Sequence, residues 1–154
     1  MLPTGVRVIT DNRRARHEYH IVERVEAGIA LVGTEVKSMR MGRVNLADAY
    51  AAWENGEVIL HNMHISPYDP ASQFNHDPRR SRRLLLHKSE IAKLRGRVVE
   101  RGFTLIPLRL YFRKNLVKVE LALAKGKRLH DKRQAIAKRD REREVERDLR
   151  DRQR

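Results

Sequence analysis

The sequence predicts a mainly β protein, a small closed barrel of about six short antiparallel strands with two to three short helices. Three observations predict this class. Several segments alternate apolar and polar residues with the period of two of a half-buried strand, tight-turn sequences join two pairs of these segments, and two other segments have helical spacing. The chain has 154 residues, 40% of them hydrophobic, which suffices for one modest core. We therefore expect a barrel-forming body over residues 1–126 and a tail over residues 127–154.

The first elements of the body are expected between residues 12 and 32. A short helical turn around residues 12–16 precedes a strand over residues 17–25, where apolar and polar side chains alternate. Residues 26–28 (Glu-Ala-Gly) are expected to end this strand in a turn. A second, more apolar strand then covers residues 28–32.

Two hairpins are expected where turn sequences separate the later strands. Residues 55–56 (Asn-Gly) suit a two-residue turn, because both positions of such a turn need positive φ. Residues 113–115 (Arg-Lys-Asn) form the second turn. The strands that these turns join are expected over residues 48–54, 57–65, 103–112 and 116–124. Pro107 predicts an edge or a bulge in its strand, since it has no backbone N–H to donate.

Two further segments are expected to be helices, each with a capping signal at its start and a glycine at its end. The first has its cap at residues 33–35 and ends at Gly42. The second has its cap at Ser89 and ends at Gly102. The apolar residues at helical spacing are Val36 and Met39 in the first helix, and Ile91, Leu94 and Val98 in the second.

The charge of the chain points to a polyanionic partner. Lys and Arg number 34 against 20 Asp and Glu, which gives a formal net charge of +14, and such a charge repels itself inside a compact protein. Nucleic acid is the usual reason for this balance.

The absence of cysteine excludes disulfides, thiolate metal sites and cysteine nucleophiles. Residues 1–12 lack a signal-peptide core and no apolar run could span a bilayer, so we expect a soluble cytoplasmic protein without a membrane partner.

The tail differs from the body in its pattern. It holds 12 basic and 7 acidic residues, and neighbouring opposite charges favour a helix locally. Its large apolar residues fall in two pairs on nearly opposite sides of such a helix, so no single face can pack on the body. These residues are Leu129, Ile136, Val145 and Leu149. We expect the tail to be disordered alone and helical when a partner holds it; the alternative is a helix docked on the body.

Three runs of basic residues are candidates for binding phosphate, because the arginine fork makes bidentate hydrogen bonds to it. The runs are Arg13, Arg14 and Arg16; Arg79, Arg80, Arg82 and Arg83; and Lys125, Lys127, Arg128, Lys132 and Arg133. Aromatic residues make up only 5% of the chain, which disfavours base stacking across a sheet and favours recognition of a folded RNA by shape and phosphate. The alternative is that each run only makes the surface soluble.

The sequence indicates neither a metal site nor a catalytic one, and no cofactor is expected. His61 and His64 are three residues apart in an expected strand, where their side chains point to opposite faces. No glycine-rich phosphate loop is present. Glu26 is expected to be an isolated carboxylate at a turn. It is either a plain turn residue or an acceptor for a base edge on an otherwise basic protein.

Five stretches together resemble the SmpB family of bacterial tmRNA-binding proteins. They are residues 12–19 (Asn-Arg-Arg-Ala-Arg-His-Glu-Tyr), 26–28 (Glu-Ala-Gly), 33–38 (Gly-Thr-Glu-Val-Lys-Ser), 77–86 (Asp-Pro-Arg-Arg-Ser-Arg-Arg-Leu-Leu-Leu) and 124–133 (Ala-Lys-Gly-Lys-Arg-Leu-His-Asp-Lys-Arg). The resemblance implies an OB-fold-like barrel that binds the tRNA-like domain of tmRNA. It further implies partnership with the stalled 70S ribosome and its small-subunit RNA, with the tail in the empty mRNA channel.

The resemblance also implies which residues make these contacts. Those expected to bind tmRNA are Asn12, Arg13, Arg14, Arg16, Glu26, Lys37, Leu85 and His87, the last standing where some members have asparagine. Those expected at the ribosome and its decoding centre are His17, Lys125, Gly126, Lys127, Arg128, His130, Asp131, Lys132 and Arg133. Gly126 would give the tail its turn, and His130 would stack near a base.

The hypothesis from the sequence is therefore a non-catalytic RNA-binding adaptor of ribosome rescue by trans-translation. Two alternatives belong to other classes. One is a structural ribosomal protein whose basic tail threads through ribosomal RNA. The other is an RNA-processing enzyme that uses His17 or His130 as a general base.

Overall fold

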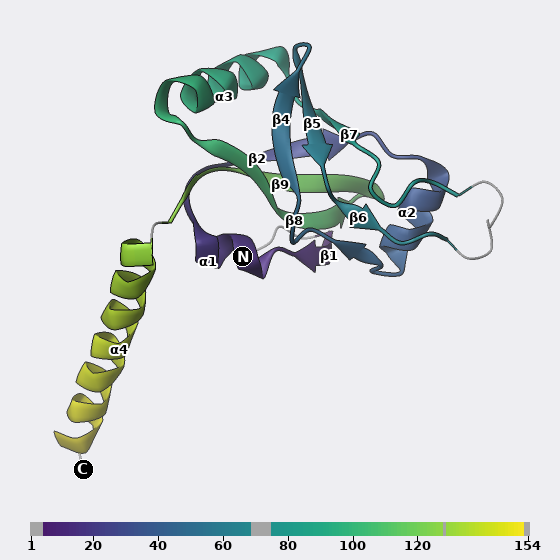
Figure 1. Ribbon diagram of the computed structural model, residues 1–154. Coiled ribbons are helices and arrows are strands. Elements are labelled where there is room, and N and C mark those ends of the chain that lie inside the picture. The colour runs from purple at the N-terminus through teal and green to yellow at the C-terminus, as the bar shows by residue number, and fades with distance from the viewer. Residues whose placement is uncertain (1–4, 69–74, 128, 153–154) are drawn as a thin grey trace.

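The structure is a computed structural model that describes residues 5–68, 75–127 and 129–152 (Figure 1). Side chains are described in these ranges except at 99–101, 129–138 and 151–152. The elements in chain order are β1 (Val6–Asp11), α1 (Arg13–Glu18), β2 (Tyr19–Ile29), α2 (Gly33–Arg40), β3 (Val44–Asn45), β4 (Tyr50–Glu54), β5 (Glu57–His61), β6 (His64–Ile65), β7 (Arg82–Leu85), α3 (Lys88–Arg101), β8 (Thr104–Arg113), β9 (Leu116–Gly126) and α4 (Leu129–Arg152).

The predicted barrel is confirmed. Within the described ranges, six antiparallel strands pair in the order β8, β4, β5, β7, β2 and β9, and β9 pairs with β8 again to close the ring. The long strand β8 pairs with β4 near its start, at Leu105, and with the added strand β1 along its second half. Strand β1 was not predicted, and neither was the small separate sheet of β3 and β6.

Apolar side chains fill the barrel and also cover part of its outside. The main core includes Val58, Leu60 and Leu110, all fully buried. A smaller cluster on the outer face of β8 and β9 packs under α1, around Ala15 and Leu108. Because α1 covers this end of the hairpin, the two strands are apolar on both faces there. The predicted inward-facing residues of the last strand are confirmed as buried: Val117, Val119, Leu121 and Leu123.

Both predicted hairpins are confirmed, including their turn geometry. Asn55 and Gly56 have φ of 52° and 79°, and Lys114 and Asn115 have φ of 50° and 65°. The register of β8 against β9 shifts just after Pro107, which is the predicted bulge. The strand expected over 57–65 is wrong as one element. It divides into β5 and β6 because residue 62 adopts positive φ.

The predicted break at residues 26–28 is wrong, because β2 runs without interruption from Tyr19 to Ile29. Gly28 does not form a turn but lets β2 and the Leu85 side chain on β7 lie close together. A Cβ placed on Gly28 would lie 3.2 Å from the Cβ of Leu85. A glycine in a strand often marks such an approach. The short helical turn expected around residues 12–16 is confirmed as the helix α1, which continues to Glu18.

Both body helices are confirmed, with a correction to their caps. Val32 caps α2, and its N–H donates to Glu35 Oε1 at 2.9 Å. His87, two residues earlier than expected, caps α3. The helix ends at Gly102 as predicted, where φ is 66°.

The tail forms the single helix α4, which extends away from the barrel in Figure 1. All side chains described in it, over residues 139–150, are exposed, including Val145 and Leu149. The helical form agrees with the form expected for a bound tail, and the disorder expected of the free tail stays a prediction. This part of α4 also does not pack on the body, as the divided apolar residues predict. No helix in the described ranges is long and apolar enough to cross a membrane.

Candidate nucleic-acid interface

The outer face of strands β7, β2, β9 and β8 brings together two residues predicted to bind RNA. Leu85 on β7 pairs with Gly28 on β2, and Glu26 lies two residues before Gly28, so its side chain points to the same face. Leu85 is 48% exposed although it is a large apolar residue. Gly28 leaves room for it, since a side chain there would meet Leu85. Glu26 and Leu85 therefore form one surface, which we term the Glu26 face.

Two residues of β8 hold the carboxylate of Glu26. The hydroxyl of Tyr111 donates to Oε2, and Nη1 of Arg113 donates to Oε1 at 3.1 Å. Burial, together with the neighbouring Glu26 carboxylate, raises the pKa of the Tyr111 hydroxyl, so it stays protonated as a donor. The prediction of an isolated carboxylate is wrong. Sequence reasoning missed both partners, since they lie more than 80 residues away along the chain and no spacing signals them.

The carboxylate of Glu26 keeps capacity for a further partner. Its side chain is 32% exposed, and two of its roughly four lone-pair sites are used by Tyr111 and Arg113. Lys118 on β9 stands opposite Gly28 on one side and Tyr111 on the other. The Glu26 face thus presents a fixed acceptor between Arg113 and Lys118 on one side and Glu120 opposite it on β9, and the acceptor suits the donors of a base edge.

His87 and Lys37 lie beyond this face. His87 is exposed two residues after Leu85, where β7 ends and α3 begins. Lys37 is exposed on α2, and its Nζ lies 5.4 Å from the centre of the Tyr68 ring. Their predicted contacts with RNA stay predictions.

A second basic surface lies where α1 meets the start of the tail. Tyr19 pairs with Gly126, and the N–H of Lys127 donates to the carbonyl of Glu18 at 2.8 Å. Gly126 is the last residue of β9, and its predicted role in turning the tail stays a prediction. The exposed cations that meet here come from both ends of the body: Arg13, Arg14, Arg16 and Lys125, with Lys127 partly exposed and the exposed His17 beside them. We term this the tail-base surface.

The residues predicted to bind tmRNA therefore divide between two places. Arg13, Arg14 and Arg16 lie with the residues predicted to contact the ribosome, not with Glu26. The two places are separated along β2 from Tyr19 to Glu26, about 23 Å at the rise of a strand. Arg14 is also engaged by Glu18 at 3.1 Å, and Arg16 by Asp11 at 3.3 Å, so neither guanidinium is fully free for phosphate.

The prediction that Asn12 contacts RNA is corrected by its surroundings. Its side chain caps α1 and is only 5% exposed. Nδ2 donates to the carbonyls of Pro107 at 2.9 Å and Leu46 at 3.3 Å, and Oδ1 accepts from the N–H of Ala15 at 3.3 Å. Asn12 therefore fixes α1 to the barrel and presents no group to a ligand.

The second basic run is also not one phosphate-binding cluster. Arg82 is fully buried in β7, and its Nε donates to Glu35 Oε2 at 2.5 Å. Arg80 donates to the other oxygen of Glu35, also at 2.5 Å. Burial alone would raise the pKa of the Glu35 carboxyl, but hydrogen bonds from Arg80, from the backbone and from Arg82 lower it overall. This buried cluster joins α2 to β7, and of the run only Arg79 and Arg83 stay exposed.

The remaining predicted residues of the tail lie at the limit of the structure. Arg128 lies outside the described residues. Four more of the predicted residues lie in α4, where the structure describes their backbone but not their side chains: His130, Asp131, Lys132 and Arg133.

The histidines do not assemble a metal site in the part of the chain that the structure describes, where no group of three or more potential ligands occurs. His61 and His64 lie on different strands, β5 and β6, so the expectation of one shared strand is wrong. His61 instead hydrogen-bonds Glu54 at 2.7 Å and Ser81 at 2.8 Å.

Comparison with known proteins gives consistent matches over nearly the whole chain. The sequence model of the family described as "SmpB protein" matches residues 9–151. An "SsrA-binding protein" from Moorella thermoacetica is 64% identical over 149 residues, covering 96% of each chain. The one from Pelotomaculum thermopropionicum is 58% identical over 150 residues, covering 97% of this chain and 98% of the relative. Among solved structures, "tmRNA-SmpB: a journey to the center of the bacterial ribosome" aligns with a TM-score of 0.67 and 49% identity, covering 86% of this chain and 95% of that one.

Proposed function

The chain belongs to the SmpB family, and we propose from this that it is the tmRNA-binding adaptor of trans-translation. It binds the tRNA-like domain of SsrA RNA, which is tmRNA, and brings the alanine-charged RNA to stalled ribosomes in the cytoplasm. The names of its relatives and the ribosome-bound structural match support this function.

The observation that carries the RNA-binding proposal is the Glu26 face. A carboxylate on a protein of net charge +14 works against general attraction to RNA, so its place on an exposed face needs a specific role. Tyr111 and Arg113 orient it, and Leu85 adds an exposed apolar surface beside it. This combination suits a folded RNA element that offers an unpaired base edge and a ribose or base surface.

The tail-base surface supports a separate role for the tail. It gathers cations from α1 and from the end of β9 at the point where α4 leaves the barrel (Figure 1). The charged side chains of α4 are exposed over the described residues 139–150, and a channel lined with phosphate would supply partners for such cations. We propose that α4 and this surface act at the decoding centre, while the Glu26 face holds tmRNA.

A pair of matched variants tests the Glu26 face. Glu26→Gln keeps the size of the side chain and removes its charge, and we expect it to weaken binding of the tRNA-like domain about 10- to 100-fold, since a hydrogen bond to a charged group contributes roughly 1.5–3 kcal/mol. Glu120→Gln is the control, because Glu120 faces Glu26 across the strands and is paired with Arg24 at 3.2 Å.

The measurement is fluorescence anisotropy of labelled RNA at fixed salt, with an unrelated tRNA as competitor. Weaker binding by Glu26→Gln alone supports the proposal. Equal weakening in both variants, or none in either, would contradict it.

The proposed function includes no catalytic step. Labelled tmRNA incubated with the protein and a divalent metal ion should therefore keep its full length. Shortened RNA that disappears in a His17→Ala variant would favour the RNA-processing alternative instead.

A further inference from the structure

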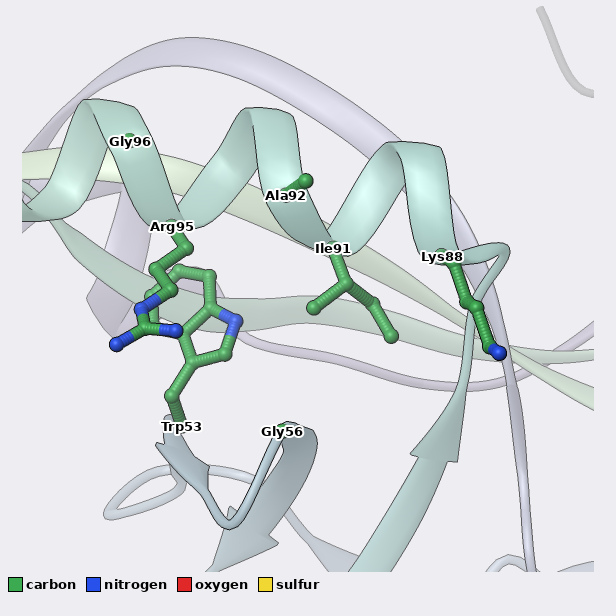
Figure 2. A pocket seen from close by; sticks show the side chains of 7 residues that line it. All are labelled: Trp53, Gly56, Lys88, Ile91, Ala92, Arg95 and Gly96. Carbon is green, nitrogen blue, oxygen red and sulfur yellow. The ribbon is translucent and has the colours of Figure 1, made fainter.

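An open cleft lies between α3 and the tip of the β4–β5 hairpin, on residues that the proposed function does not use (Figure 2). Its volume is about 560 Å³, which lies within the range of small-ligand sites. Ile91 and Arg95 point from α3 toward the hairpin, where Trp53 forms the opposite wall. Gly96 leaves the helix surface open, since a Cβ on it would meet nothing within 4 Å.

Trp53 gives this cleft an aromatic wall with an unused donor. Trp53 is partly buried and packs against the main core. Its indole Nε1 is buried and has no hydrogen-bond partner among the described residues, although a buried indole N–H usually finds one. The exposed side chain of Arg95 lies beside the ring in Figure 2.

The charge of the cleft matches an anionic ligand. The described residues that line it include Lys88 and Arg95, both exposed, and no carboxylate. Cations beside an aromatic face are the usual composition of a site for an unpaired nucleotide, because the base stacks and the phosphates pair with the cations.

The cleft is also continuous with the surface that is proposed to bind tmRNA. A neighbouring hollow on the same side of α3 is lined by Leu85 and His87, and the two hollows share Gly56, Lys88 and Ile91. An RNA strand that crosses Leu85 and His87 would therefore pass Lys88 before it reaches Trp53.

We propose that the cleft receives one unpaired base of the bound RNA, which stacks on Trp53 while Lys88 and Arg95 pair with the flanking phosphates. The inference rests on the proposed function and adds a base-binding subsite to it. Because every base has a stacking face, this contact is tolerant of sequence, whereas the Glu26 face reads a base edge.

Trp53 is the single tryptophan of the chain, so its fluorescence tests the proposal directly. Unlabelled tRNA-like domain of tmRNA should quench Trp53 emission and saturate at the affinity that anisotropy of the labelled RNA reports in parallel. If anisotropy shows binding and the emission stays unchanged, the subsite is wrong while the proposed function stands. If anisotropy shows no binding at all, the proposed function fails as well.

Two substitutions on α3 sharpen the test. Gly96→Leu fills the cleft and replaces glycine with a better helix former, so the fold should be retained in thermal unfolding. We expect it to abolish the quenching and to weaken RNA binding about 5- to 100-fold, the range found when one base loses its stacking partner. Binding at the wild-type affinity by this variant would overturn the proposal.

Arg95→Gln and Arg97→Gln separate the cleft from general charge, since each removes one exposed arginine from the same helix. Arg97 pairs with Glu23 at 2.7 Å and does not line the cleft. We expect Arg95→Gln to weaken binding several-fold more than Arg97→Gln and to change the extent of quenching. Equal effects of the two substitutions would show that α3 contributes only its net charge.

Discussion

The barrel and the tail are both basic and both place arginine beside glutamate, but the barrel buries such a pair, whereas the described part of the tail exposes one. In the barrel, Glu35 is fully buried between Arg80 and Arg82. In α4, Glu146 and Arg150 are 4.0 Å apart, with side chains 70% and 77% exposed. The same chemical groups thus form a rigid contact where the fold encloses them and a solvated surface where it does not. The barrel therefore has its contacts before any partner arrives, whereas the charged side chains of α4 over residues 139–150 face the solvent.

The largest expected effect on stability comes from breaking one pair in each region. Glu35→Ala leaves two arginines without their carboxylate, one of them fully buried, and should lower the free energy of unfolding by about 3–5 kcal/mol. Glu146→Ala removes an exposed helix pair and should change it by less than about 0.5 kcal/mol. Urea unfolding followed by Trp53 fluorescence measures both. Similar losses in the two variants would mean that the tail packs on the barrel.

Acid should destabilise the barrel through the same buried carboxyl. The folded state lowers the pKa of Glu35, so its contribution to stability is present above the pKa of an unfolded glutamate, about 4.3, and is lost as pH falls through the lower folded value. We expect the unfolding free energy to fall below about pH 4.5. The slope should be shallower in Glu35→Gln, and an unchanged slope would show that other carboxyls dominate.

A smaller effect is expected on the Glu26 face, where the contacts orient a group for binding. Tyr111→Phe removes one donor to Glu26 but leaves Arg113, so tmRNA affinity should fall about 2- to 10-fold, as for one ordinary hydrogen bond. Anisotropy titration measures this change. The loss should vanish when Glu26 is already glutamine. If Tyr111→Phe still weakens binding in that background, Tyr111 contacts RNA by another route.

The smallest effect is expected on the salt dependence of tmRNA binding when the tail is deleted. If the barrel holds tmRNA, the dependence of binding on salt should come from cations of the body. Deletion of residues 127–154 should then change the slope of log K against log salt by less than about one phosphate contact, which is 0.7–0.9. A much shallower slope would assign a share of tmRNA binding to the tail.

Features set by neighbouring residues could be predicted from the sequence. The two hairpins, the bulge at Pro107 and the end of α3 at Gly102 each depend on local backbone preferences. The closure of six strands into a barrel followed from counting such segments. The tail was recognised because its apolar residues share no face.

Features that depend on distant residues could not be predicted. Gly28 resembles a turn residue in the sequence, and only the approach of Leu85 across the sheet explains it. Arg82 is indistinguishable from Arg79 in the same run, yet Glu35 on α2 draws it into the core. The role of Glu26 as an acceptor for RNA stays a prediction, and its position is fixed by partners from β8 that no local pattern indicates.

One measurement tests the division of labour between barrel and tail most directly. A protein lacking residues 127–154 is compared with the full chain in two assays on the same preparation, a tmRNA titration and alanine transfer from charged tmRNA on reconstituted stalled ribosomes. Since the barrel strands and the Glu26 face are complete by Gly126, we expect near-normal tmRNA affinity and loss of alanine transfer. Transfer at the full rate would contradict a role for the tail at the ribosome, and loss of tmRNA binding would contradict the assignment of that binding to the barrel.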